Sequence, residues 1–155
     1  MERFGIQYEE IEVMRVHVCI KSDDNRILTC KKGQITMIPF TGTVEGTIFN
    51  GIVCPGGCDV QLENNAQVRH MCARYMLEGK DSDGEPARIY IENNGWFTDG
   101  IFPQPFTAVP VFYTDSEKLA AFFDENEFIA KGYPGENGPD ICFYRLKVCQ
   151  GDGSC

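Results

Sequence analysis

The sequence predicts an all-β protein: a closed or nearly closed antiparallel β-barrel with one short α-helix near residues 115–123. Three observations support this fold class. The chain of 155 residues contains 16 glycines and 8 prolines, which interrupt it throughout. The apolar runs between them are mostly short, as expected for strands joined by turns. One segment stands out by helical spacing of its apolar residues. Many short strands with frequent turns indicate a sandwich or a barrel, and we favour the barrel.

The expected elements follow one another without a repeat or a domain linker. Eight runs favour strands: residues 9–20, 33–39, 44–54, 67–78, 87–93, 106–113, 128–132 and 141–148. Turn-forming residues separate them at 22–25, 55–57, 63–65, 82–84 and 134–138. We therefore expect a single barrel domain over residues 7–148, followed by a flexible tail at residues 149–155.

The two strands around residues 82–84 predict a hairpin with a defined register. Apolar and polar residues alternate on both sides of this turn. A three-residue loop with Gly84 in the left-handed conformation sets apolar residues opposite one another and Arg74 opposite Glu92. A two-residue turn would mix the apolar and charged faces, and such a one-residue slip is costly. The pattern therefore favours the three-residue loop.

The helix is predicted directly after the strand at residues 106–113. Thr114 and Glu117 have the spacing of a capping box, in which a hydroxyl and a carboxylate satisfy free N–H groups at a helix N-terminus. Leu119, Phe122 and Phe123 then fall on one face. Acidic residues follow at once, and they oppose the dipole at a helix C-terminus. We expect a short helix whose apolar face covers an open end of the strand assembly.

The charge argues against two classes of partner. Lys and Arg total 14 against 23 Asp and Glu, which gives a formal net charge of −9. This balance disfavours nucleic acid and an anionic membrane. No apolar run reaches the roughly 18 residues of a membrane span, and residues 1–10 show no apolar core of a signal peptide. We expect a cytoplasmic protein.

The eight cysteines are too few for a disulfide scaffold, and in the cytoplasm we expect all eight as thiols. Cys54 and Cys58 are separated by three residues, but a second pair with zinc-finger spacing is missing. Whether these two cysteines pair or bind a metal stays open; both alternatives are less favoured than free thiols, and a redox pair is less favoured than zinc. The glycine clusters lack the lysine of a phosphate-binding loop. The sequence therefore predicts neither a metal nor a cofactor.

Six polar residues form the candidate site: Glu45, Asp59, His70, Arg74, Tyr90 and Glu92. Inside a pocket, an arginine can bind a carboxylate or an enolate, and a neighbouring carboxylate or histidine can transfer a proton. On the outside of a sheet, the same residues form exposed ion pairs of small energetic weight. Both alternatives stand at this point. Trp96 could line an apolar mouth of the barrel, although core packing is the commoner role of such a residue.

Several motifs resemble one known family. They are P-F-T-G-T-V-E-G at residues 39–46, G-I-V-C-P-G-G-C-D at residues 51–59, A-R-Y at residues 73–75, D-G at residues 83–84 and I-Y-I at residues 89–91. In this order they resemble the domain of unknown function 3237 family over most of residues 9–148. The resemblance implies a lipocalin-like antiparallel barrel with a short helix, and it implies no general activity.

The same resemblance places recurrent polar positions of the family at Glu45, Asp59 and Arg74, and it favours an Arg74 that points inward. Two positions depart from the family pattern. Val60 stands where an aromatic residue is usual, and Cys72 stands where an acid is usual. If that acid takes part in chemistry, this chain has lost it or acts on a different substrate.

We therefore expect a barrel that binds a small, partly apolar, anionic ligand. Barrels of eight strands are just wide enough to hold side chains or one small ligand. Arg74 would anchor the anion. The expected ligand-binding residues are Arg74, His70, Tyr90, Glu92 and Trp96.

Two alternatives belong to other classes of function. The first is a cofactor-free isomerase, hydratase or cyclase with Asp59, Arg74 and Glu45 as catalytic residues. Several acids near one arginine would leave one of them with a raised pKa, and we expect this of Asp59. The second is a structural subunit without a ligand. We also expect a homo-oligomer, because an exposed strand edge or apolar patch promotes assembly.

Overall fold

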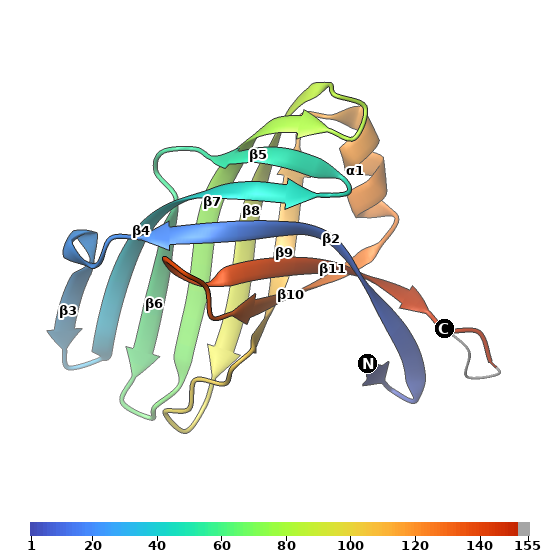
Figure 1. Cartoon of the computed structure of the whole chain (residues 1–155). Coiled ribbons are helices and arrows are strands. Elements are labelled where there is room, and N and C mark those ends of the chain that lie inside the picture. The colour runs from blue at the N-terminus through green and yellow to red at the C-terminus, as the bar shows by residue number, and fades with distance from the viewer. Residues whose placement is uncertain (152–155) are drawn as a thin grey trace.

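The computed structural model describes residues 1–151 and confirms the all-β prediction, with strands over 65% of the chain. Figure 1 shows a barrel of long, curved strands with one helix at its upper right. The strands are β1 (Glu2–Arg3), β2 (Ile6–Ile20), β3 (Arg26–Cys30), β4 (Gly33–Gly46), β5 (Phe49–Val53), β6 (Cys58–Asn64), β7 (Arg69–Asp81), β8 (Pro86–Phe97), β9 (Phe106–Thr114), β10 (Glu127–Tyr133) and β11 (Asp140–Val148). The helices are the 3-10 helix η1 (Ser22–Asp24) and the α-helix α1 (Glu117–Asp124).

The barrel is closed because β2 pairs with both β11 and β4. From β11 the antiparallel order runs through β10, β9 and β8 to β7. The strands β5 and β6 share one place in the ring, since both pair with β4 on one side and with β7 on the other. The ring therefore has eight places. The strand β3 pairs with β4 alone and lies at the edge of the sheet.

The largest difference from the sequence prediction lies between residues 26 and 64. The strand β4 runs without a break where two strands were expected, and β3 and β6 were not expected at all. The strand β6 was not predicted because its apolar and polar residues lie on the opposite faces from those expected. Val60 and Leu62 point outward, while the polar Asp59 and Gln61 point into the barrel. A search for apolar residues on the buried face does not detect such a strand.

The predicted hairpin is confirmed, and its buried face is now known. Arg74 lies opposite Glu92 in the pairing of β7 with β8. Gly84 has a φ of +80°, which is the left-handed conformation that the three-residue loop requires. Leu77 and Ile89 lie opposite each other and are fully buried. On both strands the odd-numbered residues face the barrel interior, so the even-numbered Arg74 and Glu92 point outward.

The helix is confirmed, but its first turn begins later than expected. The N-cap is Ser116, whose side chain accepts a hydrogen bond from the N–H of Leu119. Thr114 is instead the last residue of β9, where its hydroxyl donates to the carbonyl of Arg88. The ring of Phe123 stacks on Phe112 at a centroid distance of 4.4 Å. The helix thus lies at the end of the barrel where β9 finishes, opposite the loop between β8 and β9.

The described part of the chain corrects one expectation about cysteines. Cys149 is disulfide-bonded, so the prediction of eight thiols is wrong at this position. Six cysteines, at positions 19, 30, 54, 58, 72 and 142, are free. Most of the expected tail, residues 152–155, lies outside the described residues. Over residues 1–151, no helix is long and apolar enough to cross a membrane. The cytoplasmic location stays a prediction.

Candidate functional site

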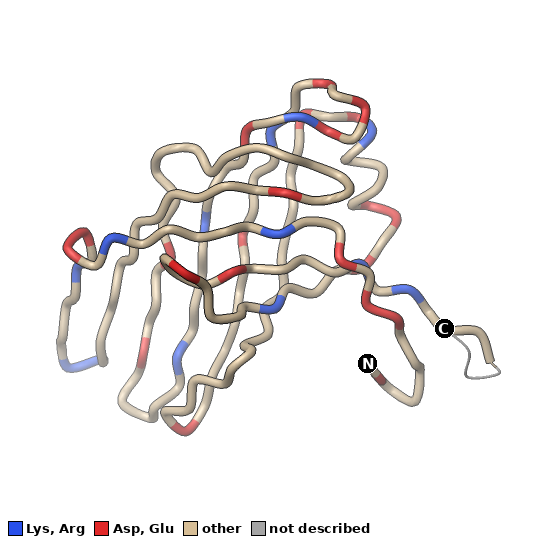
Figure 2. Tube along the Cα trace, viewed as in Figure 1, with Lys and Arg blue, Asp and Glu red and all other residues tan. Residues whose placement is uncertain are grey.

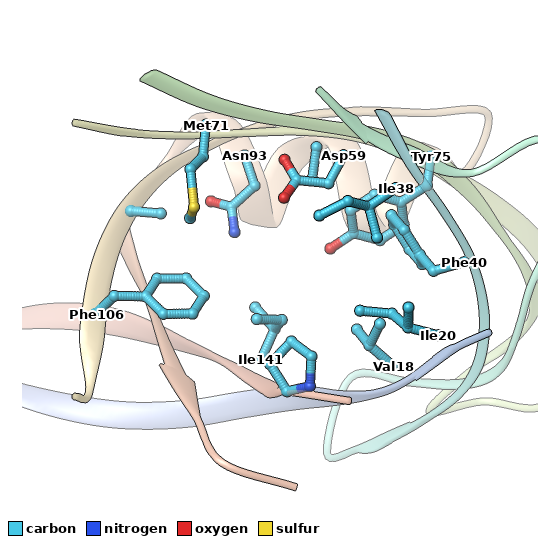
Figure 3. Close-up of a pocket in the computed structure, with 13 residues that line it drawn as sticks. Val18, Ile20, Ile38, Phe40, Asp59, Met71, Tyr75, Asn93, Phe106 and Ile141 are labelled. Carbon is cyan, nitrogen blue, oxygen red and sulfur yellow. The ribbon is translucent and has the colours of Figure 1, made fainter. Parts of the chain in front are cut away.

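A cavity of about 60 Å³ lies inside the barrel. Its wall contains a row of four residues that face one another across neighbouring strands: Ile38 on β4, Asp59 on β6, Ala73 on β7 and Asn93 on β8. Ala73, between Asp59 and Asn93, contributes only a methyl group to this wall. Figure 3 shows the carboxylate of Asp59 and the amide of Asn93 next to each other, both pointing into the cavity. Most of the remaining wall is apolar.

Asp59 is the charged side chain of this wall, and it is poorly solvated. Its Oδ2 accepts a hydrogen bond of 2.8 Å from Nε2 of Gln61. Its Oδ1 is buried and has no hydrogen-bond partner. Burial raises the pKa of Asp59, and the Gln61 hydrogen bond and the charges of His70 and Arg69 offset this only in part. The raised pKa agrees with the sequence expectation, although its cause is burial rather than crowding by other acids.

Two further polar side chains line the cavity. Asn93 is 6% exposed, and its Oδ1 is a second buried oxygen without a hydrogen-bond partner. Tyr75 is buried and forms a T-shaped ring pair with Phe40, at a centroid distance of 5.1 Å. Burial, together with the charge of Asp59, raises the pKa of Tyr75, so its hydroxyl stays protonated at neutral pH. This cavity, which we call the chamber, is thus lined by a carboxyl, an amide and a phenol group in apolar surroundings.

The chamber continues into an outer hollow of about 340 Å³ that shares Asp59, Met71 and Phe106 with it. Gln61 and Gln104 add amide groups to this hollow, which we call the vestibule. Its rim comes from the loop between β8 and β9 and from residues 133–139. The vestibule lies at the barrel end away from α1, so the helix does not block it.

The position of Phe106, which lies between chamber and vestibule, depends on a glycine. A Cβ atom at position 132 would overlap the ring of Phe106, so Gly132 allows the far end of this ring to lie against the backbone of β10. The glycine thereby sets how far Phe106 extends into the chamber. Its role is a close approach between a ring and a strand backbone, not a turn.

The structure does not place Arg74 in the cavity, which corrects the inward position that the family resemblance favoured. Its side chain is 65% exposed on the outer face of β7, and its Nε lies 3.5 Å from Oε1 of Glu92. The hydroxyl of Tyr90 donates to the same carboxylate oxygen at 2.9 Å. The physical reason is the alternation of the strand, since Tyr75 and Leu77 occupy the interior. Arg74, Glu92 and Tyr90 therefore form a polar cluster on the outer face.

The remaining predicted residues also lie outside the barrel, in two separate places. His70 and Trp96 stack on the outer face at a centroid distance of 4.6 Å, and Trp96 is 60% exposed. Glu45 is on β4, where its Oε1 lies 3.1 Å from Nε2 of His17. The other ring nitrogen of His17 lies 2.9 Å from Oδ1 of Asp140. Hydrogen bonds to Glu45 and Asp140 raise the pKa of His17.

Of the seven site residues predicted from the sequence, only Asp59 lines the cavity. Asn93, Tyr75 and Gln61 were not predicted as site residues. Asn93 could have been found, because it continues the inward series of Ala87, Ile89 and Ile91 along β8. Gln61 could not, since β6 itself was not predicted. Among residues 1–151, no three His, Cys, Asp or Glu side chains are grouped so that they could hold a metal ion.

Comparison with known proteins finds relatives of the same architecture. A UPF0311 protein of Clostridium acetobutylicum is 35% identical over 103 residues, which are 66% of this chain and 56% of that protein. The chain thus spans little more than half of that relative. A crystal structure of a protein with unknown function from Clostridium acetobutylicum is 27% identical, with a TM-score of 0.73 over 91% of this chain and 100% of that one.

A third match is more distant. The crystal structure of an enzyme from Penicillium herquei is 16% identical, with a TM-score of 0.61 over 95% of this chain and 98% of that one. This identity establishes a shared fold alone. Residues 11–146 match the family described as protein of unknown function, DUF3237. The match covers nearly the whole barrel, and the chain therefore belongs to the DUF3237 family.

Proposed function

We propose that this barrel binds a small, uncharged, mostly apolar molecule that carries a hydroxyl or an amide N–H group. The observation that carries the proposal is the pair of buried oxygens without partners, Asp59 Oδ1 and Asn93 Oδ1, on the wall of an apolar cavity. Leaving a buried acceptor unsatisfied costs about 1–3 kcal/mol. A ligand that donates a hydrogen bond to these oxygens recovers part of that cost.

The charge of the cavity supports an uncharged ligand over the anion expected from the sequence. Neither the chamber nor the vestibule is lined by Lys, Arg or His. Arg69, whose charge acts on Asp59, is already paired with Glu63. A ligand carboxylate near Asp59 would therefore lie in mostly apolar surroundings without a free counter-charge, which is unfavourable. The raised pKa of Asp59 fits the same conclusion, because burial at this place already disfavours a negative charge.

The dimensions support a ligand that enters with its polar end first. The chamber of about 60 Å³ holds only a small group, whereas the vestibule of about 340 Å³ holds a larger body. Ligand sites are commonly apolar with a few polar groups that fix orientation. In this arrangement the ligand hydroxyl reaches Asp59 and Asn93, and the apolar body packs on Phe106 and Met71.

Phenol, benzene and benzoate test the proposal, since they have similar size and differ in polarity. Titration of isotope-labelled protein by NMR would follow the backbone amides of Ala73 and Ala108. Phenol is expected to shift them at a lower concentration than benzene, and benzoate to leave them unchanged. Asn93→Ala should weaken phenol binding about fivefold to tenfold, as loss of one hydrogen bond implies. Arg74→Met is the control and should not alter it. Binding of benzoate in preference to phenol would contradict the proposal.

A second candidate function is acid–base catalysis without a cofactor, as in an isomerase, a hydratase or a cyclase. The observation that favours it is the raised pKa of Asp59 beside a protonated Tyr75, in a chamber open to a vestibule. A carboxyl group with a pKa moved toward neutrality can donate and then recover a proton. The description of the Penicillium herquei protein as an enzyme agrees that this fold can carry catalysis.

Deuterium exchange into cyclohexanone tests this second candidate, because the reaction needs only a proton taken from the carbon beside a carbonyl. The parent protein in heavy water should incorporate deuterium faster than the buffer, as measured by mass spectrometry. Asp59→Asn should remove the acceleration, and Glu92→Gln on the outer face should leave it intact. Equal rates for the parent and Asp59→Asn would reject Asp59 as the base.

A further inference from the structure

The strand β3 presents an open edge outside the closed barrel. It pairs with β4 along its whole length and with no other described strand. All five of its residues are exposed, with Ile27 at 65% and Leu28 at 59%. Natural proteins protect such edges with prolines, inward-facing charges or covering loops. The strand β3 has no proline, and its single charged residue, Arg26, stands at its first position. Its backbone therefore offers a row of hydrogen-bonding groups with which another strand can pair.

The charges that flank β3 indicate which strand fits. Asp23 and Asp24 precede it, and Lys31 and Lys32 follow it. All four are exposed, and within residues 1–151 none forms an ion pair. Figure 2 shows the acidic turn and the basic turn at opposite ends of the strand. If the β3 of a second copy of the chain paired antiparallel, the acidic turn of each copy would lie beside the basic turn of the other. In a parallel pair, turns of like charge would lie together.

The outer face of the sheet carries an apolar row that ends at this edge. The row crosses five neighbouring strands through Leu28, Ile35, Leu62, His70 and Trp96. Leu28, Leu62 and Trp96 are each more than 40% exposed. Contiguous apolar surface of this kind marks interaction sites. Because Leu28 is the last member of the row, a partner strand beside β3 would extend the row rather than cover its middle.

We propose that two copies of this chain form a dimer through antiparallel pairing of β3 with the partner's β3. The two-fold axis stands perpendicular to the sheet beside Leu28, the middle residue of the strand. Leu28 then lies opposite the partner's Leu28, and Arg26 lies opposite the partner's Cys30. Asp24 comes next to the partner's Lys32, and the reverse pair forms at the other end. The contact is isologous, because each copy contributes the same surface.

Sedimentation equilibrium tests the dimer, and two lysine variants of matched exposure locate it. The parent should show twice the 17.4 kDa mass of the chain. Leu28→Lys sets two like charges across the axis and should raise the dissociation constant about tenfold or more. Val109→Lys changes a residue of nearly equal exposure, 58% against 59%, on β9, and should leave the dimer intact. Far-UV circular dichroism verifies that both variants are folded.

A charge exchange tests the antiparallel orientation. Replacing Asp23 and Asp24 with lysine gives both ends of β3 the same sign and should weaken the dimer. Adding Lys31→Asp and Lys32→Asp restores opposite signs and should restore the dimer. Added salt should weaken the parent dimer by screening its ion pairs and strengthen the lysine variant by screening its like charges. A parent that sediments as a monomer overturns the proposal. So does a dimer that Val109→Lys breaks and Leu28→Lys does not.

Discussion

The inner and outer faces of β6, β7 and β8 carry polar side chains of opposite character. On the outer face, charged residues satisfy one another: Arg74 lies near Glu92, and Arg88 lies near Glu78. On the inner face, Asp59 and Asn93 each keep an oxygen without a partner. The polar groups of the more charged outer face therefore have partners, whereas the inner face, with few polar groups, holds two oxygens that have none.

The energies explain why the two faces should be interpreted differently. An exposed ion pair contributes about 0–1 kcal/mol, whether or not it has a function. A buried polar atom without a partner costs about 1–3 kcal/mol. Native proteins satisfy nearly all such atoms, so an exception needs a reason. At Asp59 and Asn93 the reason that fits the neighbouring cavity is a ligand, which the phenol titration tests.

The largest expected change in the free energy of unfolding comes from comparing substitutions at two adjacent positions of β7, one on each face of the sheet. Leu77 is fully buried, whereas Met76 is 41% exposed. Leu77→Ala should lower the free energy of unfolding by about 2–5 kcal/mol through lost burial and a new cavity. Met76→Ala should change it by about 0.5 kcal/mol or less. Urea denaturation measures both values, and similar losses would show that the two faces are not distinct in the way described.

The second prediction concerns the acid inside the barrel. Asp59→Asn should raise the free energy of unfolding at neutral pH by about 1 kcal/mol, because the folded parent then holds a poorly solvated carboxylate and the variant does not. The amide oxygen can still accept the hydrogen bond from Gln61. Denaturation of both proteins at several pH values measures the difference.

The sign of the pH dependence follows from the direction of the pKa shift. The folded pKa of Asp59 lies above its ordinary value of 3.8. Between these two values the folded state binds more protons than the unfolded state, so stability falls as the pH rises. The advantage of Asp59→Asn should therefore shrink on acidification and stop changing below about pH 3.8. An advantage that grows on acidification would mean that the carboxylate is stabilised in the folded protein.

The third prediction uses a titrating group on the outer surface. His17 is held between Glu45 and Asp140, and its pKa is raised above 6.5. Its contribution to stability is fully present below pH 6.5 and is lost as the pH rises through the raised pKa. The side chain is 38% exposed, so solvent screening limits the effect to about 0.5 kcal/mol. His17→Gln should remove this pH step, and Lys118→Gln, at another exposed pair, should keep it.

The fold was predictable where local pattern and packing agree. The hairpin of β7 and β8 followed from alternation and from Gly84, because a wrong register would bury charge. The strands β3 and β6 did not follow. All residues of β3 are exposed, so no alternation of burial marks it. The strand β6 has its polar residues inside, which conflicts with the rule that identifies strands.

The candidate site was only partly predictable for the same reason. The charged residues were identified correctly as neighbours, since Arg74 does face Glu92. Which face lies inside depends on the sum of burial over the whole sheet, and the family resemblance pointed the other way for Arg74. Asp59 was among the polar residues singled out, and the family resemblance also places a recurrent polar position there. Asn93 is a neutral residue in an apolar series, and a search for charge does not find it.

The smallest expected change, that of Arg74→Met, tests the contrast between the outer and inner faces of the sheet most directly. Arg74→Met keeps the aliphatic stem and removes the charge from the outer face. Because the guanidinium is 65% exposed and its contact with Glu92 is 3.5 Å long, the midpoint of urea denaturation should stay the same as in the parent. Glu92 keeps its hydrogen bond from Tyr90 and is not left alone. Phenol binding should be equal in both proteins, because Arg74 touches neither the chamber nor the vestibule. A clearly lower midpoint would mean that Arg74 is buried against a partner, such as a second copy or a ligand on the outer face. In that case the outer face of β7 and β8, rather than the barrel interior, would become the first place to search for function.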